Sequence, residues 1–586
     1  MALTRRGWFG AAAVAALAGA PRAASAQAPR PLGDGPSTTP PGPPAPPFRI
    51  SAPGAGTHDY TEALERLRAY ALSELRELGL PGMTLAVTDA DGFTACLPLG
   101  WADVERPSPV REGTYFQIGS ISKSFVALTV LALADRGKLD IDAPLARYLP
   151  QVPLPHEPIT LAQLLSHTSG LPDGAPAFPR TPDGRLWCGF APGSSFSYSN
   201  VGFMLLGRVI EAVTGQPFQM AVDEMVRRPL GLTGILGVIR EQERARYAVG
   251  YWPWDPFLAG ELPHSALGIA YWTPEDTPAG SVGARATDMA IYLRALMRLA
   301  RGQGAPVLSD AAARRFVRPV IDSAADFGPG SRYAMGIDIA PVDGIDCLHH
   351  TGGMMAFSSS FHADAAAGVA AFASVNARLG GYRPRRTTAY AIRLMRAVRA
   401  GARLPDPPDA LQGQWLDDGA QYTGRFVASD QRSFEIEGSG PSARLTSDEV
   451  SGRLSPRGPD RLVTDHPKFD RYGFDAVRQG GRITGFWWGE SLFSRDVAAA
   501  PTVRSSTLAP LAGVYLNRDP WIGGAELLVR GDRLVLEGAG PLAFQDGYWT
   551  TAREKPGVER MRFDAPLNGR MTRLNVSGWD LLRLAV

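Results

Sequence analysis

The sequence predicts an α+β domain, in which helices and a helical region flank an antiparallel sheet, followed by two small antiparallel β-barrels. The chain has 586 residues, which is too long for one hydrophobic core. Between residues 58 and 400 a strand pair comes first, helices follow and strands return, so one sheet can gather both ends of this segment. After residue 410, short strands punctuated by turns occur in two similar copies, which indicates two further domains.

The first 57 residues are expected to direct export rather than to join the fold. Residues 1–28 have the three parts of a twin-arginine signal: Arg5 and Arg6 before aromatics, a weakly apolar stretch, and small residues at 24–26. The apolar stretch is shorter than the roughly 20 residues that span a bilayer, so no stable membrane span is expected after signal removal. Residues 29–57 are rich in proline and predict a stiff linker. A bacterial periplasmic or secreted protein is therefore expected.

Residue periodicity predicts the elements of the segment 58–400 in order. Apolar residues at helical spacing over 60–78 predict an amphipathic helix that ends at Gly79. Residues 82–89 and 92–100 predict two strands joined by a turn, and residues 121–136 are apolar nearly all round, as in a buried helix. The remaining predicted elements are helices at 159–166, 200–213 and 287–299 and strands at 348–350, 358–362 and 369–375.

An internal repeat predicts the two barrels, at residues 411–500 and 505–586. The matching segments are 422–426 with 511–515, 473–476 with 562–565, and 481–484 with 569–572. The first two pairs share an offset of 89 residues and the third an offset of 88, so order and spacing are kept. Each copy is long enough for about six to eight short strands, which predicts a small antiparallel barrel. Structural support and control of substrate access both stay open as the role of these barrels.

Composition excludes several classes of partner and cofactor. Charged residues make up 20% of the chain and the net charge is +2, so nothing selects nucleic acid or an anionic membrane. Three widely spaced cysteines, Cys96, Cys188 and Cys347, exclude a disulfide scaffold, and no CxxC or HExxH spacing indicates a metal site. No metal, cofactor or nucleic-acid partner is therefore expected.

The first chemical motif is Ser120-Ile-Ser-Lys123, at the start of the buried helix predicted for residues 121–136. A helix N-terminus favours developing negative charge, but a serine hydroxyl is a poor nucleophile until a neighbour takes its proton. Lys123 lies on the same helical face and can take that proton if burial lowers its pKa. A capping serine beside a solvated lysine is the alternative interpretation. Only four of the 60 basic residues are lysines, so lysine here indicates a need for its chemistry.

The second motif is Tyr198-Ser-Asn200, just before the helix predicted to begin at residue 200. A tyrosine near the serine hydroxyl can relay a proton to the leaving group. An amide can hold both the lysine ammonium and a substrate carbonyl. Taken alone, the motif is also compatible with a serine-rich turn before a helix.

The third motif is His350-Thr351-Gly352-Gly353, which precedes a strand-like run. Consecutive glycines let the backbone approach a ligand closely. A strand-edge N–H can complete an oxyanion hole with the N–H of Ser120. An ordinary turn is the alternative interpretation, so the order and spacing of all three motifs carry the prediction.

With these motifs, residues 79–376 resemble the serine β-lactamase and penicillin-binding family, on the branch of class C β-lactamases, D-aminopeptidases, DD-carboxypeptidases and related esterases. Further segments typical of this branch are 137–144, 164–170, 278–281 and 287–288. The resemblance implies that Ser120 is acylated, with Lys123 and Tyr198 handling protons. It implies an oxyanion hole from the N–H groups of Ser120 and Gly353. The substrate-binding residues that it implies are Asn200, His350, Thr351, Gly352 and Gly353.

One position departs from this branch. Class C β-lactamases usually carry lysine where this chain has His350, and the lysine charge receives the carboxylate of the antibiotic or of a terminal D-alanine. A histidine near its ordinary pKa of ~6.5 is a weaker, pH-dependent anion site. Histidine at this position resembles the D-aminopeptidase and esterase members. The D-aminopeptidases also carry two C-terminal β-barrels, as this chain is predicted to do.

The resemblance and the motifs together predict an exported serine hydrolase that cleaves amide or ester bonds through a Ser120 acyl-enzyme, as a D-aminopeptidase, D-amino-acid amidase or esterase-like protein. The expected partner is a small peptide, amide or ester substrate. The alternative enzyme is a class C-type β-lactamase or a DD-carboxypeptidase. The alternative from another class is a non-catalytic protein that binds cell-wall peptides or β-lactams. The complete Ser, Lys, Tyr and Asn set favours the enzyme, while substrate and oligomeric state stay open.

Overall fold

Two compact units make up the described chain. The computed structural model describes residues 49–50, 58–253, 267–379, 382–409, 419–439, 442–458, 460–495, 497–498, 503–519, 521–551 and 558–584. The first unit takes in the described residues up to Trp252 and from Gly268 to Asp409, and the second takes in Pro253, Leu267 and the described residues of Ala410–Val586. The predicted export signal at 1–28 lies outside the described residues, as does the predicted linker at 29–57 except for Arg49–Ile50. Within these described ranges, no helix is long and apolar enough to cross a membrane.

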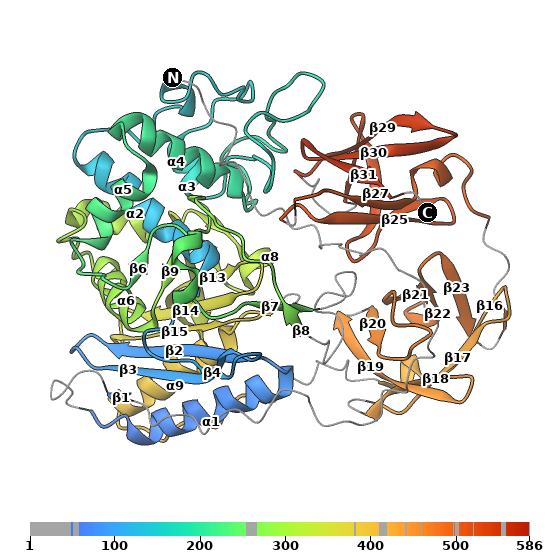
Figure 1. Cartoon of the computed structure of the whole chain (residues 1–586), viewed down its shortest axis with the longest axis horizontal. Helices are drawn as coiled ribbons and strands as arrows, with labels where there is room; N and C mark the ends of the chain where they lie inside the picture. Colours follow the sequence, from blue (N-terminus) through green and yellow to red (C-terminus); the bar gives the residue numbers. More distant parts are fainter. Residues whose placement is uncertain are drawn as a thin grey trace. The chain divides into compact units, whose positions relative to one another are not determined.

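One antiparallel sheet forms the centre of the first unit and confirms the predicted α+β class (Figure 1). Its strands are β1 (Arg49–Ile50), β2 (Gly82–Asp89), β3 (Thr94–Asp103), β4 (Ser108–Pro109), β10 (Ile321–Asp322), β11 (Arg332–Tyr333), β12 (Asp338–Val342), β13 (Ile345–Gly353), β14 (Ser358–Asp364) and β15 (Val369–Val375). The strand order is β1-β3-β2-β15-β14-β13-β12-β11-β10, and β4 pairs with β3. Since β15 pairs with β2 along its whole length, the late strands do return to the first strand pair.

Two short sheets complete the strands of this unit. The first joins β5 (Phe116–Gln117), β9 (Gly283–Ala284) and β6 (Ile235–Leu236), and the second joins β7 (Tyr251–Pro253) to β8 (Leu267–Ile269). The predicted linker also contributes to the main sheet, because Arg49 and Ile50 pair with Cys96 and Ala95 of β3. That strand was not predicted, since proline dominates the composition of the segment around it.

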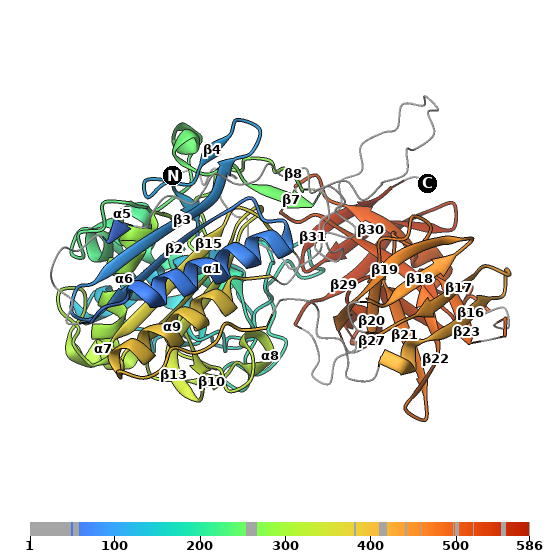
Figure 2. The same cartoon turned by 90° about the horizontal axis from the view of Figure 1, so that it is seen from below.

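Helices cover both faces of the main sheet. They are α1 (Thr61–Leu78), α2 (Ser122–Asp135), α3 (Leu161–Leu165), α4 (Asn200–Thr214), α5 (Phe218–Val222), α6 (Ala286–Ala300), α7 (Asp310–Phe316), α8 (Ala324–Phe327) and α9 (Arg385–Arg399). Figure 1 shows α1 and α9 below the sheet and α6 above it, and Figure 2, seen from below, shows α1 and α9 side by side. β15 is buried along its whole length because α6 and α9 both pack against it.

Local sequence explains where these helices begin and end. α1 ends at Gly79, whose φ of 62° lies in the left-handed region that glycine adopts without strain. α2 is buried at every position from Ser122 to Leu133, as its continuous apolar sequence predicts. A single 3-10 turn, η1 (Gly119–Ile121), precedes α2 and carries Ser120. α9 was not predicted, because arginines at its ends and on its outer face mask the apolar stripe that it buries.

The second unit consists of two closed eight-stranded antiparallel barrels, which confirms the predicted architecture. The first barrel comprises β16 (Gly424–Ala428), β17 (Ser433–Glu437), β18 (Arg444–Ser447), β19 (Val450–Gly458), β20 (Arg461–Thr464), β21 (Phe474–Gln479), β22 (Arg482–Trp488) and β23 (Ser491–Arg495). The second comprises β24 (Gly513–Leu516), β25 (Gly524–Arg530), β26 (Arg533–Leu536), β27 (Gly540–Gln545), β28 (Tyr548–Thr551), β29 (Met561–Leu567), β30 (Arg570–Val576) and β31 (Trp579–Arg583). The repeated segments fall on the first, sixth and seventh strands of each barrel.

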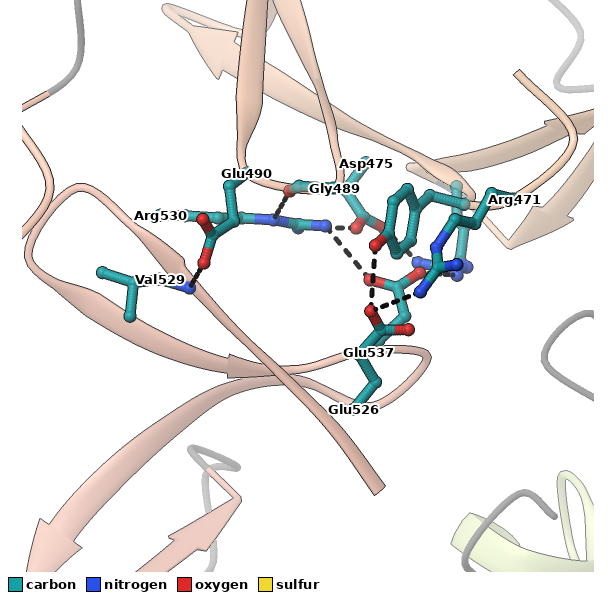
Figure 3. Close-up of polar contacts among 10 residues, drawn as sticks. Arg471, Asp475, Gly489, Glu490, Glu526, Val529, Arg530 and Glu537 are labelled. Carbon is teal, nitrogen blue, oxygen red and sulfur yellow. Dashed lines mark hydrogen bonds and ion pairs between the residues drawn. The ribbon is translucent and has the colours of Figure 1, made fainter. Parts of the chain in front are cut away.

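A network of charges around the buried Arg530 joins the two barrels, and its other members are half-buried (Figure 3). Arg530 of the second barrel bonds the carboxylates of Asp475 at 2.7 Å and Glu537 at 3.2 Å and the carbonyl of Gly489 at 2.7 Å. Arg461 of the first barrel bonds the same two carboxylates, at 2.8 and 2.7 Å. Burial raises the pKa of Glu537 and the two arginines oppose that rise. Two cations and two anions thus neutralise one another where the barrels meet.

We expect Arg530→Met to lower the free energy of unfolding of the barrel pair by about 3 kcal/mol, because it removes a buried cation from two carboxylates. Denaturant unfolding followed by tryptophan fluorescence measures this loss, since the Arg530 guanidinium lies 5.9 Å from the ring centre of Trp487. Arg504→Met is the control, because its pair with Glu490 is exposed and is worth less than about 1 kcal/mol. Equal losses in both variants would contradict the role of burial.

Candidate active site

Ser120 lies at the entrance to α2, where the chain passes from β5 into η1. Gly119 before it has a φ of 55°, and a Cβ there would lie 2.7 Å from the amide nitrogen of Gly353, so glycine is required. Ser120 itself is half-buried, while Gly119 and Ile121 are buried, which leaves its side chain within reach of a substrate. The N-terminal end of α2 favours negative charge that develops beside Ser120.

Lys123 is completely buried and lies at the centre of the site. Its Nζ is 3.1 Å from Ser120 Oγ, 2.6 Å from Asn200 Oδ1 and 2.7 Å from the carbonyl oxygen of Ala279. Burial lowers the pKa of Lys123 to about 7, and the carboxylate of Asp173 opposes that fall. A neutral amine has two N–H groups and one lone pair. With Asn200 and Ala279 as acceptors of its two protons, the lone pair is available for the proton of Ser120.

Tyr198 lies just before α4, with its ring 4.8 Å from Lys123 Nζ. Its hydroxyl is shielded from solvent. Burial raises the pKa of Tyr198 above its usual value, and interaction with the Ser120 hydroxyl opposes the rise. The phenol therefore keeps its proton at neutral pH and can donate it. Ser199 caps α4, since its hydroxyl accepts the N–H of Gly202 at 3.1 Å, and this cap fixes the entry of Asn200 into the helix.

His350 differs from the pH-dependent anion site that the sequence predicted. Its ring is completely buried in β13, with Nε2 2.9 Å from the hydroxyl of Tyr333 and Nδ1 2.6 Å from the carbonyl oxygen of Thr351. Burial, followed by the charge of Lys123, lowers the pKa of His350 to about 4. The expected ordinary pKa is therefore wrong, and the ring is neutral at physiological pH. Both ring nitrogens are bonded to protein atoms rather than left for an anion.

Gly352 and Gly353 bring the end of β13 against the turn that carries Ser120. A Cβ on Gly352 would overlap the carbonyl oxygen of Ile118 and lie 3.3 Å from the amide nitrogen of Ser120. Gly119 of η1 also lies against Gly353, because a Cβ on Gly119 would come within 2.7 Å of the amide nitrogen of Gly353. The backbone amides of Ser120 and Gly353 thus belong to one close contact between η1 and β13. Two N–H groups placed in this way can stabilise an oxyanion.

Comparison with known proteins identifies the family. The family model described as Beta-lactamase matches residues 61–395, which is more than half of the chain. The chain belongs to the β-lactamase family. This family comprises serine hydrolases, and the site described above lies within the matched region.

Curated relatives in this family have different activities. The esterase EstB of Burkholderia gladioli is 35% identical over 232 residues, which cover 35% of this chain and 58% of that protein. A β-lactamase of Pseudomonas fluorescens is 33% identical over 191 residues, which cover 30% of this chain and 51% of that protein. The chain spans about half the length of these curated relatives. An octameric penicillin-binding protein homologue from Pyrococcus abyssi, 20% identical, covers 73% of this chain and 99% of its own with a TM-score of 0.52, which shows a shared fold.

Three groups in the site were not predicted from the family motifs. They are the carbonyl of Ala279, which accepts from Lys123, the side chain of Asp173, which bonds Asn200, and the imidazole of His167. Two of these groups, His167 and Ala279, lie in the segments 164–170 and 278–281, which are typical of the β-lactamase family. The sequence shows that these segments resemble the family, but the contacts that they make form only in the folded chain.

His167 holds the backbone on both sides of Tyr198. Its carbonyl oxygen accepts the N–H of Ser197 at 2.9 Å, and its Nδ1 accepts the N–H of Ser199 at 3.1 Å. Its ring centre lies 4.2 Å from that of Tyr198, and its φ of 56° is rare for a residue with a side chain. Burial, then the charge of Lys123, holds the pKa of His167 well below its ordinary value, so Nδ1 stays an acceptor.

We expect His167→Leu to lower kcat by roughly 100-fold, because the loss of the Nδ1 acceptor displaces the segment that carries Tyr198. His167→Asn is the matched variant, since an amide oxygen can accept the same N–H and asparagine tolerates a positive φ. We expect it to keep kcat within about tenfold of the wild type. Steady-state kinetics on a p-nitrophenyl ester, with the melting temperature of each variant, measure the difference. Equal kcat values for the two variants would contradict this role.

Proposed function

We propose that this protein is an exported serine hydrolase that cleaves amide or ester bonds through an acyl-enzyme on Ser120, as an esterase or a D-amino-acid peptidase or amidase. The observation that carries the proposal is the buried amine of Lys123, 3.1 Å from Ser120 Oγ and with a pKa lowered to about 7. A lysine in that state is half neutral near physiological pH and can serve as a base.

The reaction follows from the positions of these groups. Ser120 Oγ attacks the carbonyl carbon while Lys123 takes the hydroxyl proton, and the N–H groups of Ser120 and Gly353 bond the oxyanion that forms. Tyr198 donates its proton to the departing amine or alcohol and takes up the proton that Lys123 received, and the C–N or C–O bond breaks to leave an ester on Ser120. Water then attacks the carbonyl carbon of this ester and loses a proton to the same basic groups. That proton goes to Ser120 Oγ as the bond between the acyl carbon and Oγ breaks, so the acid is released and the free hydroxyl is regenerated.

The neutral state of His350 favours substrates without a carboxylate at that position. A buried ring with a pKa of about 4 carries no charge at neutral pH, so it offers an anion no attraction. Its bond to Tyr333 of β11 instead favours a structural role that keeps β13 in place. The similarity to an esterase over 232 residues supports the same choice. Ester and neutral amide substrates are therefore proposed first.

Arg383 favours a second candidate, a DD-carboxypeptidase or class C-type β-lactamase. A Cβ on Gly353 would lie 2.9 Å from the guanidinium carbon of Arg383, so this cation borders the proposed oxyanion hole. Among the described residues its hydrogen bonds go to the carbonyl of Tyr382 at 2.6 Å and, at 3.5 Å, to the hydroxyl of Ser358. Burial, then Arg378, lowers the pKa of Arg383 to about 10, which still leaves it charged. A substrate carboxylate could bond this cation.

We expect Arg383→Gln to lower kcat/KM for substrates with a free carboxylate at least about tenfold, since a charge-assisted hydrogen bond is worth about 1.5–3 kcal/mol. Neutral esters should be unaffected if the cation contacts only the carboxylate. Arg393→Gln is the control, because its exposed pair with Asp343 lies on the outside of α9. A parallel loss for charged and neutral substrates would instead indicate that Arg383 supports the fold of the site.

The test of the main proposal is a substrate panel run on wild type and Ser120→Ala. The panel comprises D-aminoacyl amides, D-Ala–D-Ala peptides, nitrocefin and short-chain p-nitrophenyl esters. We expect turnover of the neutral amides or esters that Ser120→Ala abolishes, together with labelling of Ser120 by a fluorophosphonate probe. A wild type that is not labelled would refute the hydrolase, and labelling without turnover would support the non-catalytic binding protein.

Export is part of this proposal and is tested separately. Arg5 and Arg6 stand where a twin-arginine signal requires them, and small residues follow at 24–26. We expect the mature protein in the periplasm or the medium of a bacterial host. Replacement of both arginines by lysine should retain it in the cytoplasm, and an unchanged distribution would contradict this route.

A further inference from the structure

The loop that ends at Asp173 is hydrogen-bonded to successive residues at the start of α4. The hydroxyl of Ser199 donates to the carbonyl of Pro172 at 2.7 Å, and the N–H of Val201 donates to the carbonyl of Asp173 at 3.1 Å. Between these two contacts lies Asn200, whose own bonds go to the Asp173 side chain. The loop therefore determines how the Tyr-x-Asn segment is presented to the rest of the site.

The carboxylate of Asp173 fixes which end of the Asn200 amide faces Lys123. Its Oδ1 accepts the backbone N–H of Asn200 at 3.0 Å and the side-chain Nδ2 at 2.7 Å. Since Nδ2 is held there, the amide oxygen points the other way and accepts from Lys123 Nζ at 2.6 Å. A carboxylate, an amide and an amine thus form one hydrogen-bonded chain that ends at Ser120.

Asp173 is also the anion that acts on Lys123. Burial lowers the pKa of Lys123 to about 7, and the Asp173 carboxylate opposes that fall. The other titratable groups around the amine are His167 and His350, whose pKa values burial holds low, and Tyr198, whose pKa burial raises. All three are neutral near pH 7, so they do not replace the negative charge of Asp173.

We propose that Asp173 is a positioning residue that orients Lys123 through Asn200 and sets the pH range in which this amine accepts the proton of Ser120. In that step the Ser120 O–H bond breaks, the proton goes to Nζ and the resulting ammonium stays bonded to Asn200 and Ala279. The assignment rests on the proposed function, because it concerns the same amine. Asp173 lies outside the three family motifs and has two separable effects on Lys123: it orients the amine through Asn200, and its negative charge stabilises the ammonium.

Two variants separate these effects. Asp173→Asn keeps an oxygen that can accept from Asn200 but removes the charge, whereas Asp173→Ala removes both. The readout is the second-order rate of Ser120 labelling by a fluorophosphonate between pH 5 and 9, which needs no knowledge of the substrate. Asp183→Asn is the control, since it makes the same charge change at an exposed residue that bonds Thr181 and the backbone of Arg185.

We expect the rise of the wild-type rate with pH to have its midpoint near 7, as Lys123 loses its proton. Loss of the negative charge makes the ammonium less stable, so in Asp173→Asn the midpoint should move to lower pH by about one unit. Asp173→Ala should be labelled roughly tenfold or more slowly at its own optimum, because Asn200 is no longer oriented. Asp183→Asn should match the wild type.

The outcomes distinguish this inference from the proposed function. If the wild type is labelled at Ser120 but Asp173→Asn keeps its midpoint, the hydrolase stands and the role of Asp173 is refuted. A folded Asp173→Asn that is not labelled at any pH also refutes it, since the charge would then be essential rather than tuning. If the wild type itself is not labelled, the proposed function is refuted, and the inference about Asp173 is refuted with it. Should Asp173→Ala not fold, the isosteric asparagine variant still decides the matter.

Discussion

Lys123→Met is expected to lower kcat/KM by about 10⁴-fold while the protein stays folded, which is the upper end of what general-base catalysis contributes. Methionine fills a similar volume in the completely buried position at the start of α2, but it cannot take the proton of Ser120. Measurement of kcat/KM on the best ester or amide substrate, with the circular dichroism spectrum of the variant, checks both parts of this expectation.

Lys138→Met is the matched control, since it removes an exposed lysine just after the same helix and should leave kcat/KM unchanged. Lys123→Arg is informative beside it, because a guanidinium keeps a positive charge but does not lose its proton below about pH 12. If the arginine variant retains activity, then the charge of residue 123 matters rather than its basicity, and the assignment of Lys123 as the base is wrong.

Gly352→Ala is expected to have the second largest effect, a loss of at least about 100-fold in kcat, comparable to the loss of one oxyanion-hole donor. Its new Cβ would overlap the carbonyl oxygen of Ile118 and press on the amide of Ser120, so η1 and β13 must move apart. The backbone amides of Ser120 and Gly353, which are the proposed oxyanion donors, would then be moved apart. Steady-state kinetics and the rate of fluorophosphonate labelling both measure the loss.

Gly113→Ala is the control for the Gly352 variant, because a Cβ at residue 113 meets nothing within 4 Å. We expect it to match the wild type in both activity and stability. A Gly352→Ala protein that keeps full activity would contradict the proposed oxyanion hole, which depends on the close contact between η1 and β13. A loss of folding in Gly352→Ala, measured by thermal unfolding, would instead reflect the cost of overpacking.

The repeat is the clearest case in which the sequence was sufficient. Segments 422–426 and 511–515 are alike, and they form the same first strand, β16 and β24, of two barrels with the same eight-strand order. Two copies of one folding unit leave similar segments at a constant offset along the chain, and such an offset is a property that a sequence can display. The charges between the barrels, such as the buried Arg530, were not predicted, because single arginines at strand ends look like solvated surface residues.

His350 shows how a correct motif can lead to a wrong property. The sequence has His350 in the third family element, and its pKa was expected to lie near the ordinary value of about 6.5. Its pKa is instead lowered to about 4, because β13 carries it into a fully buried position close to Lys123. Burial and neighbouring charge are not local in sequence: Lys123 lies more than 200 residues earlier. A motif specifies the residue type at such a position, but not its charge.

Residue type, spacing and periodicity were enough to predict the α+β domain, the two barrels, the resemblance to the β-lactamase family and the three motifs around Ser120. These properties can be followed along the chain without knowledge of its folded contacts. The state of Lys123, the neutrality of His350 and the positions of Asp173 and His167 follow from the folded chain alone. Each depends on burial and on contacts between distant segments, and the pKa of a group follows from the solvent it loses and the charges it gains on folding.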